Sequence, residues 1–164
     1  MLKAYSKFLD ILEKICMGIM GVLMFLMVAA MVYQVILRYI FNDSNIWSEE
    51  ITRYMFVYVV LLGSFVAVRR NKHLQVDFLI NMFKGNFKRY FTLVTDFVVL
   101  GFLVYLLPLS YNLALDTMVS ISPGLNLPMG VVYGAVPIGT FLMILGMIEI
   151  ILEKITNKTK EGEN

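Results

Sequence analysis

Four long apolar runs, separated by short polar and charged segments, dominate the pattern of hydrophobic positions along this chain. The first covers residues 15–37, about 23 positions without a charge, which is enough for an α-helix to cross the roughly 30 Å hydrocarbon core of a bilayer. The second run, over residues 54–68, is about 15 residues long and can cross only if its helix extends beyond the apolar stretch. The third and fourth runs cover residues 97–115 and 128–148.

This pattern predicts an all-α membrane protein whose single domain covers residues 1–155. Four transmembrane helices are expected at about residues 15–37, 49–69, 91–115 and 128–152. The polar residues 156–164 are predicted to form a disordered tail.

A fifth element is predicted between the second and third runs. Over residues 76–87, apolar side chains recur at helical spacing and leave a polar face that contains Asp77 and Lys84. About twelve residues are too few to span a bilayer, so we expect a short amphipathic helix in the membrane interface. Packing of this helix on a partner protein is the alternative.

Composition and charge support the membrane class and indicate an orientation. Of the 164 residues, 59% are hydrophobic and only 16% are charged, whereas soluble domains carry about 25% charged residues. Lys and Arg gather before the first run, between the second and third, and after the fourth. The positive-inside rule therefore places both termini and the middle loop in the cytoplasm. The net charge of +2 is thus a topology signal, and no nucleic acid partner is expected.

Cysteine and histidine counts restrict the possible chemistry. Cys16 and His73 are the single residues of their types, so an internal disulfide, a dithiol redox pair and bis-histidine haem ligation within the chain are excluded. We expect Cys16 to be a packing residue and His73 to have a structural or headgroup-contacting role. No catalytic motif is present, so the chain is not expected to be an enzyme or to bind a metal or cofactor.

A polar segment between the first two runs holds the main candidate residues, which are Arg38, Trp47, Ser48, Glu49, Glu50 and Arg53. Glu49 and Glu50 lie four and three residues before Arg53, so on a helix both carboxylates can reach this cation. We predict that Arg38, Glu49, Glu50 and Arg53 form one paired network at the membrane edge. Trp47 would anchor the network at the interface, and Ser48 is a candidate helix N-cap, with Ser44 and Asn45 as alternatives.

Basic residues between the second and third runs are candidates for lipid headgroup contacts, namely Arg69, Arg70, Lys72, Lys84, Lys88 and Arg89. Asp96 is an acid inside the third predicted helix. Such an acid is paired with a basic neighbour, for example Lys88 or Arg89, or with a partner chain, or it takes part in ion or proton coupling.

Several of these residues together carry a family resemblance. Arg38-Tyr39, Phe41-Asn42, Trp47-Ser48-Glu49-Glu50 and Arg53-Tyr54, followed by Gly63, His73 and Val76-Asp77, resemble the small permease (Q-type, DctQ-like) subunit of tripartite ATP-independent periplasmic, or TRAP, transporters. Tyr58 and Gln75 depart from the family pattern. The resemblance adds His73 and Asp77 to the candidate structural or interface residues.

The resemblance implies partners and a function that the composition does not. It implies a subunit of the bacterial or archaeal inner membrane that anchors a large elevator-type (M-type) permease and helps to dock a periplasmic (P-type) substrate-binding protein. Uptake of an organic acid, for example sialic acid or a C4-dicarboxylate, would be driven by sodium. Docking through Asp43, Glu49 or Glu50 is a second hypothesis for the polar segment. An independent small transporter or channel, a scaffold of another complex, and a membrane-embedded enzyme or electron carrier are the alternatives.

Overall fold

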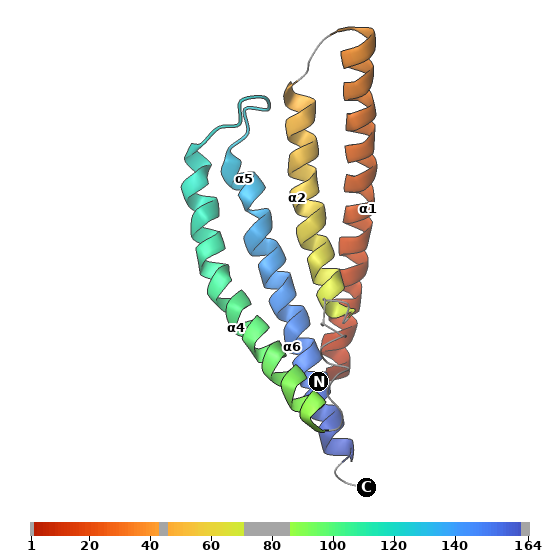
Figure 1. Ribbon diagram of the computed structural model, residues 1–164, viewed down its shortest axis with the longest axis vertical. Helices are drawn as coiled ribbons and strands as arrows, with labels where there is room; N and C mark the ends of the chain where they lie inside the picture. Colours follow the sequence, from red (N-terminus) through yellow and green to blue (C-terminus); the bar gives the residue numbers. More distant parts are fainter. Residues whose placement is uncertain (1, 43–45, 71–85, 162–164) are drawn as a thin grey trace.

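Four long helices run side by side in the protein, shown as a computed structural model in Figure 1. The structure describes residues 2–42, 46–70 and 86–161. The elements in chain order are α1 (Leu2–Ile40), α2 (Ile46–Arg69), α4 (Asn86–Asp116), the 3-10 turn η1 (Thr117–Val119), α5 (Met129–Tyr133) and α6 (Ala135–Glu161).

The predicted all-α membrane class is confirmed. Four segments are long and apolar enough to cross a bilayer, namely Ala4–Ile40, Ile46–Arg69, Phe91–Val119 and Met129–Thr156. The predicted interfacial helix over residues 76–87 lies outside the described residues, apart from its last two positions, which belong to α4.

The first helix begins much earlier than its apolar run. α1 starts at Leu2 and has 39 residues, which corresponds to about 58 Å and exceeds the hydrocarbon thickness. The predicted transmembrane segment, residues 15–37, lies within this helix, which begins earlier because charged residues continue a helix when they can be solvated or paired. At the other end of the chain, α6 continues to Glu161, past the predicted boundary near residue 152, so the predicted disorder is wrong for residues 156–161.

The last membrane span is divided into two helices at Gly134. Pro128, in an extended conformation, precedes α5, and α6 begins at Ala135. Pro137 has no N–H to donate to the carbonyl of Tyr133, so the hydrogen-bond ladder is interrupted at this position. The following bond, from the Ile138 N–H to the Gly134 carbonyl, is long at 3.4 Å.

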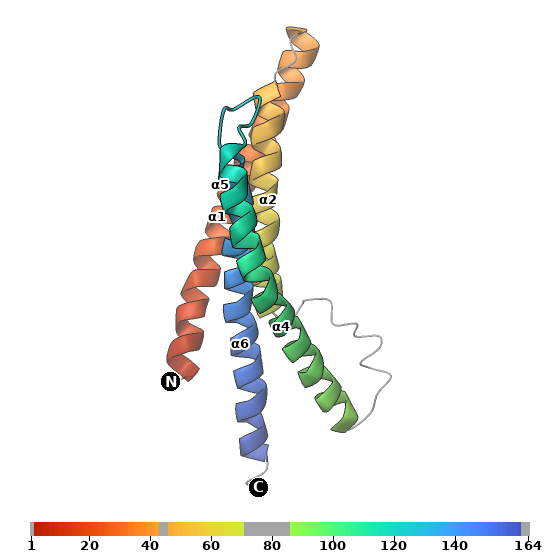
Figure 2. The same ribbon diagram turned by 90° about the vertical axis from the view of Figure 1, so that its left-hand side faces the viewer.

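The helices are arranged in the spatial order α1, α2, α6, α4. α2 packs between α1 and α6, and α4 packs on α6 and α5. In the described part of the chain, α4 touches neither α1 nor α2, so the protein is an open row rather than a closed bundle. Both chain termini lie at one end of this row, here called the terminal end, and the α1–α2 and α4–α5 connections lie at the other, the loop end. Figure 2 shows that α1 and α4 diverge towards the terminal end.

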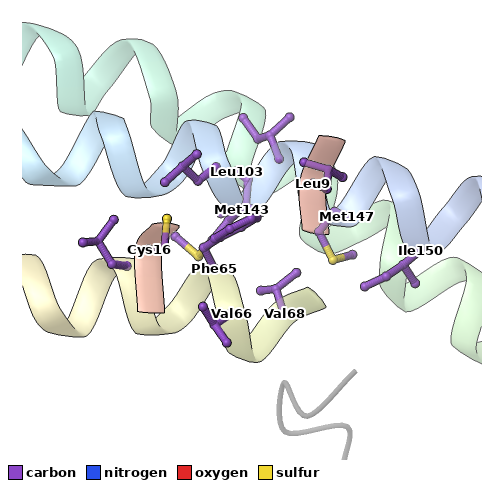
Figure 3. Close-up of a cluster of buried hydrophobic side chains, with 12 residues drawn as sticks. Leu9, Cys16, Phe65, Val66, Val68, Leu103, Met143, Met147 and Ile150 are labelled. Carbon is purple, nitrogen blue, oxygen red and sulfur yellow. The ribbon is translucent and has the colours of Figure 1, made fainter. Parts of the chain in front are cut away.

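A compact apolar cluster joins the helices of this row (Figure 3). Phe65 of α2 is fully buried and packs with Met143 and Met147 of α6. Cys16 of α1 is buried in the same cluster as a free thiol, which agrees with its expected packing role. Leu103 is the buried residue that α4 contributes to this cluster, so α6 connects the α1–α2 pair to α4.

Candidate functional sites at the two ends of the helices

At the loop end, the Glu50 carboxylate holds the loop that connects η1 to α5. Glu50 is buried, and its Oε2 accepts hydrogen bonds from the Ser122 hydroxyl and from the Gly124 and Leu125 N–H groups, the latter two at 3.0 Å each. Hydrogen bonds to an ionised acceptor are stronger than those between neutral groups. The start of α2 is thereby joined to a loop more than 70 residues later in the chain.

The loop is shaped to fit this carboxylate. The Ser122 N–H donates to the Leu127 carbonyl at 2.9 Å, and the Met129 N–H donates to the Ser120 carbonyl at 2.8 Å. A Cβ at Gly124 would lie 2.9 Å from the Glu50 Oε2, so a side chain there would displace one of the two. Glycine at this position therefore permits the close approach of the carboxylate to the loop backbone.

The neighbouring acid, Glu49, faces away from this loop. Its Oε1 accepts a hydrogen bond from the Arg53 Nη2 at 2.7 Å, and both side chains are more than 60% exposed. Helix spacing puts both glutamates within reach of Arg53, but the Arg53 hydrogen bond goes to Glu49, whereas the Glu50 carboxylate accepts its hydrogen bonds from the loop. Arg38 is exposed and forms no ion pair with any described residue. The predicted single network of four charges is thus wrong: it is divided between an exposed pair and a buried loop contact.

The remaining candidates of the polar segment lie in the first turn of α2. Trp47 stacks at a tilt on Tyr33 of α1, with ring centroids 5.9 Å apart. Ser48 is buried, and its carbonyl accepts a hydrogen bond from the Thr52 hydroxyl at 2.8 Å. Since α2 begins at Ile46, Ser48 lies inside the helix and the N-cap prediction for it is wrong.

At the terminal end, Arg69 is the centre of an ion-pair cluster that joins three helices. Its guanidinium donates to Glu149 of α6 twice, at 2.7 and 3.1 Å, and to Glu13 and Asp10 of α1 at 2.7 and 2.6 Å. A further bond reaches the Ser6 carbonyl at 3.2 Å. The planar fork of arginine allows this simultaneous contact with several carboxylates.

The lipid-headgroup prediction is therefore wrong for Arg69, whose side chain is only 8% exposed. Arg70 is about half exposed, but its Nε also donates to Glu13, at 2.7 Å. Sequence reasoning missed Asp10 and Glu13 because it began the first helix at residue 15, after both acids. Their spacing of three residues, which puts both on one helix face, was the available signal.

Asp96 of α4 pairs with Lys154 of α6. The Lys154 Nζ lies 2.5 Å from the Asp96 Oδ2, and the aspartate side chain is 9% exposed. The structure thus favours pairing over a free coupling acid, and the partner that it shows comes from another helix.

The other candidates cannot be placed. Lys72, His73, Asp77 and Lys84 lie outside the described residues. Lys88 and Arg89 belong to α4, but their side chains are not described. Among the described residues, no group of His, Cys, Asp or Glu side chains could hold a metal ion.

Four apolar helices with ion pairs near their ends define a multi-pass helical membrane protein. The family described as tripartite ATP-independent periplasmic transporters, DctQ component, matches residues 27–157. The chain belongs to this family, and it is a small TRAP permease subunit of the inner membrane.

Individual proteins similar to this chain agree with this membership. The C4-dicarboxylate TRAP transporter small permease protein DctQ of Vibrio cholerae is 30% identical over 76% of this chain and 64% of its own length. A putative TRAP transporter small permease protein of Haemophilus influenzae is 29% identical over 92% and 89% of the two chains. The sialic acid TRAP transporter permease protein SiaT of Haemophilus influenzae is 36% identical over 43% of this chain, but only 11% of that protein is covered.

Proposed function

We propose that this chain braces and anchors the large permease of a TRAP transporter and does not itself carry the solute. The observation that carries this proposal is the apolar middle of each span: residues 15–37, 54–68, 97–115 and 129–148 contain no Asp, Glu, Lys or Arg. A polar solute needs polar or charged side chains near the membrane midplane. The deepest acid of α4, Asp96, is already engaged by Lys154.

The open row of helices supports a scaffolding role. Few residues of α1 and α4 are buried, so both helices offer long apolar faces to a partner or to lipid. α6 is the most buried span and holds the row together. The similarity of 70 residues of this chain to part of the SiaT permease protein supports association with a large permease.

The loop end is proposed to face the periplasm and the terminal end the cytoplasm, on the basis of the Lys and Arg distribution. Glu49 is then exposed on the periplasmic side and available to the substrate-binding protein, whereas Glu50 shapes the adjacent loop. Replacing Glu49 by Lys should weaken docking of the binding protein and leave the two permease subunits associated. Loss of both associations together would instead assign Glu49 a role within the membrane complex.

The transported solute is proposed to be an organic acid carried with sodium. The named relatives are C4-dicarboxylate and sialic acid transporter proteins, and both solutes are carboxylates. Neither substrate is favoured over the other by any residue of this chain.

Reconstitution tests the proposal directly. The chain is co-expressed with a large TRAP permease from the same organism, co-purified, and incorporated into proteoliposomes with the binding protein and a sodium gradient. Uptake of the carboxylate is expected from the two subunits together and not from this chain alone. Uptake by this chain alone, or failure of the two subunits to co-purify, would contradict the bracing role.

A further inference from the structure

A groove of about 370 Å³ runs between α1 and α2 below the loop end, within the size range of small-molecule sites. Its lower walls are apolar: Met27 and Met31 of α1 face Phe56 of α2. From Met27 to the end of α1 at Ile40 is about 20 Å along the helix, so the groove reaches well into the hydrocarbon region. Flexible thioether side chains adapt to irregular apolar ligands.

The upper end of the same groove is polar. It is lined by Gln34 of α1 and by the ion pair of Glu49 and Arg53 on α2. Both charged side chains are more than 60% exposed, so each keeps hydrogen-bonding capacity that the pair does not use. The groove is thus amphipathic along its length.

An independent feature places this polar end at the membrane–water interface. The rings of Tyr33 and Trp47 contact each other at a tilt, and aromatic residues of these two types concentrate at the headgroup level of membrane proteins. Tyr33 precedes Gln34 directly, and Trp47 lies two residues before Glu49.

We propose that this groove is a binding site for one phospholipid whose headgroup carries a phosphate and a primary amine. The phosphate would lie against Arg53, the ammonium against Glu49, and one acyl chain between Met27, Met31 and Phe56. The inference depends on the membrane class of the chain and not on its proposed bracing role.

The chemistry of the pair selects this headgroup. Arg53 and Glu49 together carry no net charge. An anionic headgroup would be attracted by the Arg53 guanidinium but repelled by the Glu49 carboxylate. A zwitterionic headgroup complements both charges. A primary ammonium donates hydrogen bonds to a carboxylate, whereas the quaternary ammonium of choline has no N–H to donate.

A partner helix is a less suitable occupant. Covering the groove with protein would remove both exposed charges from water, and desolvation of an ion pair is costly unless new hydrogen bonds replace the lost ones. A lipid headgroup leaves them in the hydrated interface.

Native mass spectrometry of the full-length chain in detergent tests the site, with palmitoyl-oleoyl phosphatidylethanolamine as the probe. Replacing Arg53 by Ala should weaken formation of the one-lipid adduct by about fivefold. Arg38→Ala is the matched control, because Arg38 is an exposed arginine at the same end that forms no ion pair among the described residues. The one-lipid adduct of this variant should form as readily as that of the parent chain. Equal binding by the parent chain and Arg53→Ala would overturn the proposal.

The preference of the parent chain for one headgroup over another is a second measurement. It does not require the Arg53→Ala variant to fold. The parent chain should prefer phosphatidylethanolamine to phosphatidylcholine, and Glu49→Gln should remove this preference while retaining binding. No preference in the parent chain would overturn the assignment of Glu49. Loss of the lipid on co-purification with the large permease would show that a protein segment is the occupant and would overturn the lipid site.

Discussion

Arg69, the last residue of α2, and Glu149 of α6 form an ion pair of two hydrogen bonds, at 2.7 and 3.1 Å. Both side chains are less than 10% exposed. The same guanidinium binds two acids of α1, so three of the four long helices meet at this residue. An arginine at the end of an apolar run thereby fixes the relative positions of helices that are distant in sequence.

Replacing Arg69 by Ala should destabilise the protein by about 3 kcal/mol, because Glu149 and Glu13 would remain close together without their cation. Arg69→Lys should recover only part of this loss, since a single ammonium cannot bridge carboxylates on two helices as the fork does. Thermal unfolding in detergent measures the stability of both Arg69 variants. Arg38→Ala is the control and should have little effect on stability. Equal stability of Arg69→Ala and Arg38→Ala would contradict the cluster.

The Glu50 contact predicts a local change in the α4–α5 loop. Replacing Glu50 by Ala removes the acceptor of the Gly124 and Leu125 N–H groups, so their hydrogen exchange should accelerate by about tenfold or more. Glu49→Ala is the matched control, because this neighbouring carboxylate is exposed and makes no contact with the loop. Hydrogen–deuterium exchange of peptides covering the loop is the measurement, and unchanged exchange in Glu50→Ala would exclude the contact.

Replacement of glycine by alanine should have different effects on the free energy of unfolding at two positions. A Cβ at Gly139 of α6 would lie 2.8 Å from the Leu61 Cβ of α2, so Gly139→Ala should separate these helices and cost about 1–3 kcal/mol. Gly21 of α1 has no atom within 4 Å of the same position, so Gly21→Ala should be neutral or stabilise by about 0.5–1 kcal/mol. Thermal unfolding compares the two. A shift in the same direction for both variants would contradict the close α2–α6 approach.

The Asp96–Lys154 pair should show energetic coupling between α4 and α6. In a double-mutant cycle with Asp96→Asn and Lys154→Gln, we expect a coupling free energy of about 1 kcal/mol, because the aspartate is largely buried. The exposed Glu49–Arg53 pair is the control, with an expected coupling below about 0.5 kcal/mol. If the first coupling were no larger than the second, the pair would not contribute to holding α4 on α6.

At the loop end, the spacing of residues along the chain predicted one side-chain contact correctly and missed another. Glu49 and Arg53 pair as their spacing predicted, because an i,i+4 contact depends only on the helix itself. Glu50 has the same kind of neighbours, yet it binds a loop that the sequence does not place near it. Only the packing of α5 beside α2 brings its hydrogen-bond donors within reach.

The same distinction applies to the whole protein. The sequence by itself determined the membrane class and the four helices, because an uncharged run of sufficient length can satisfy its backbone in a bilayer only as a helix. Its motif residues also indicated the family to which the chain belongs. The tertiary structure decided which charges are neutralised by which partners: Arg69 by Asp10, Glu13 and Glu149, and Asp96 by Lys154. These choices depend on distances between helices, and such distances follow from the packing of the whole row rather than from any local pattern.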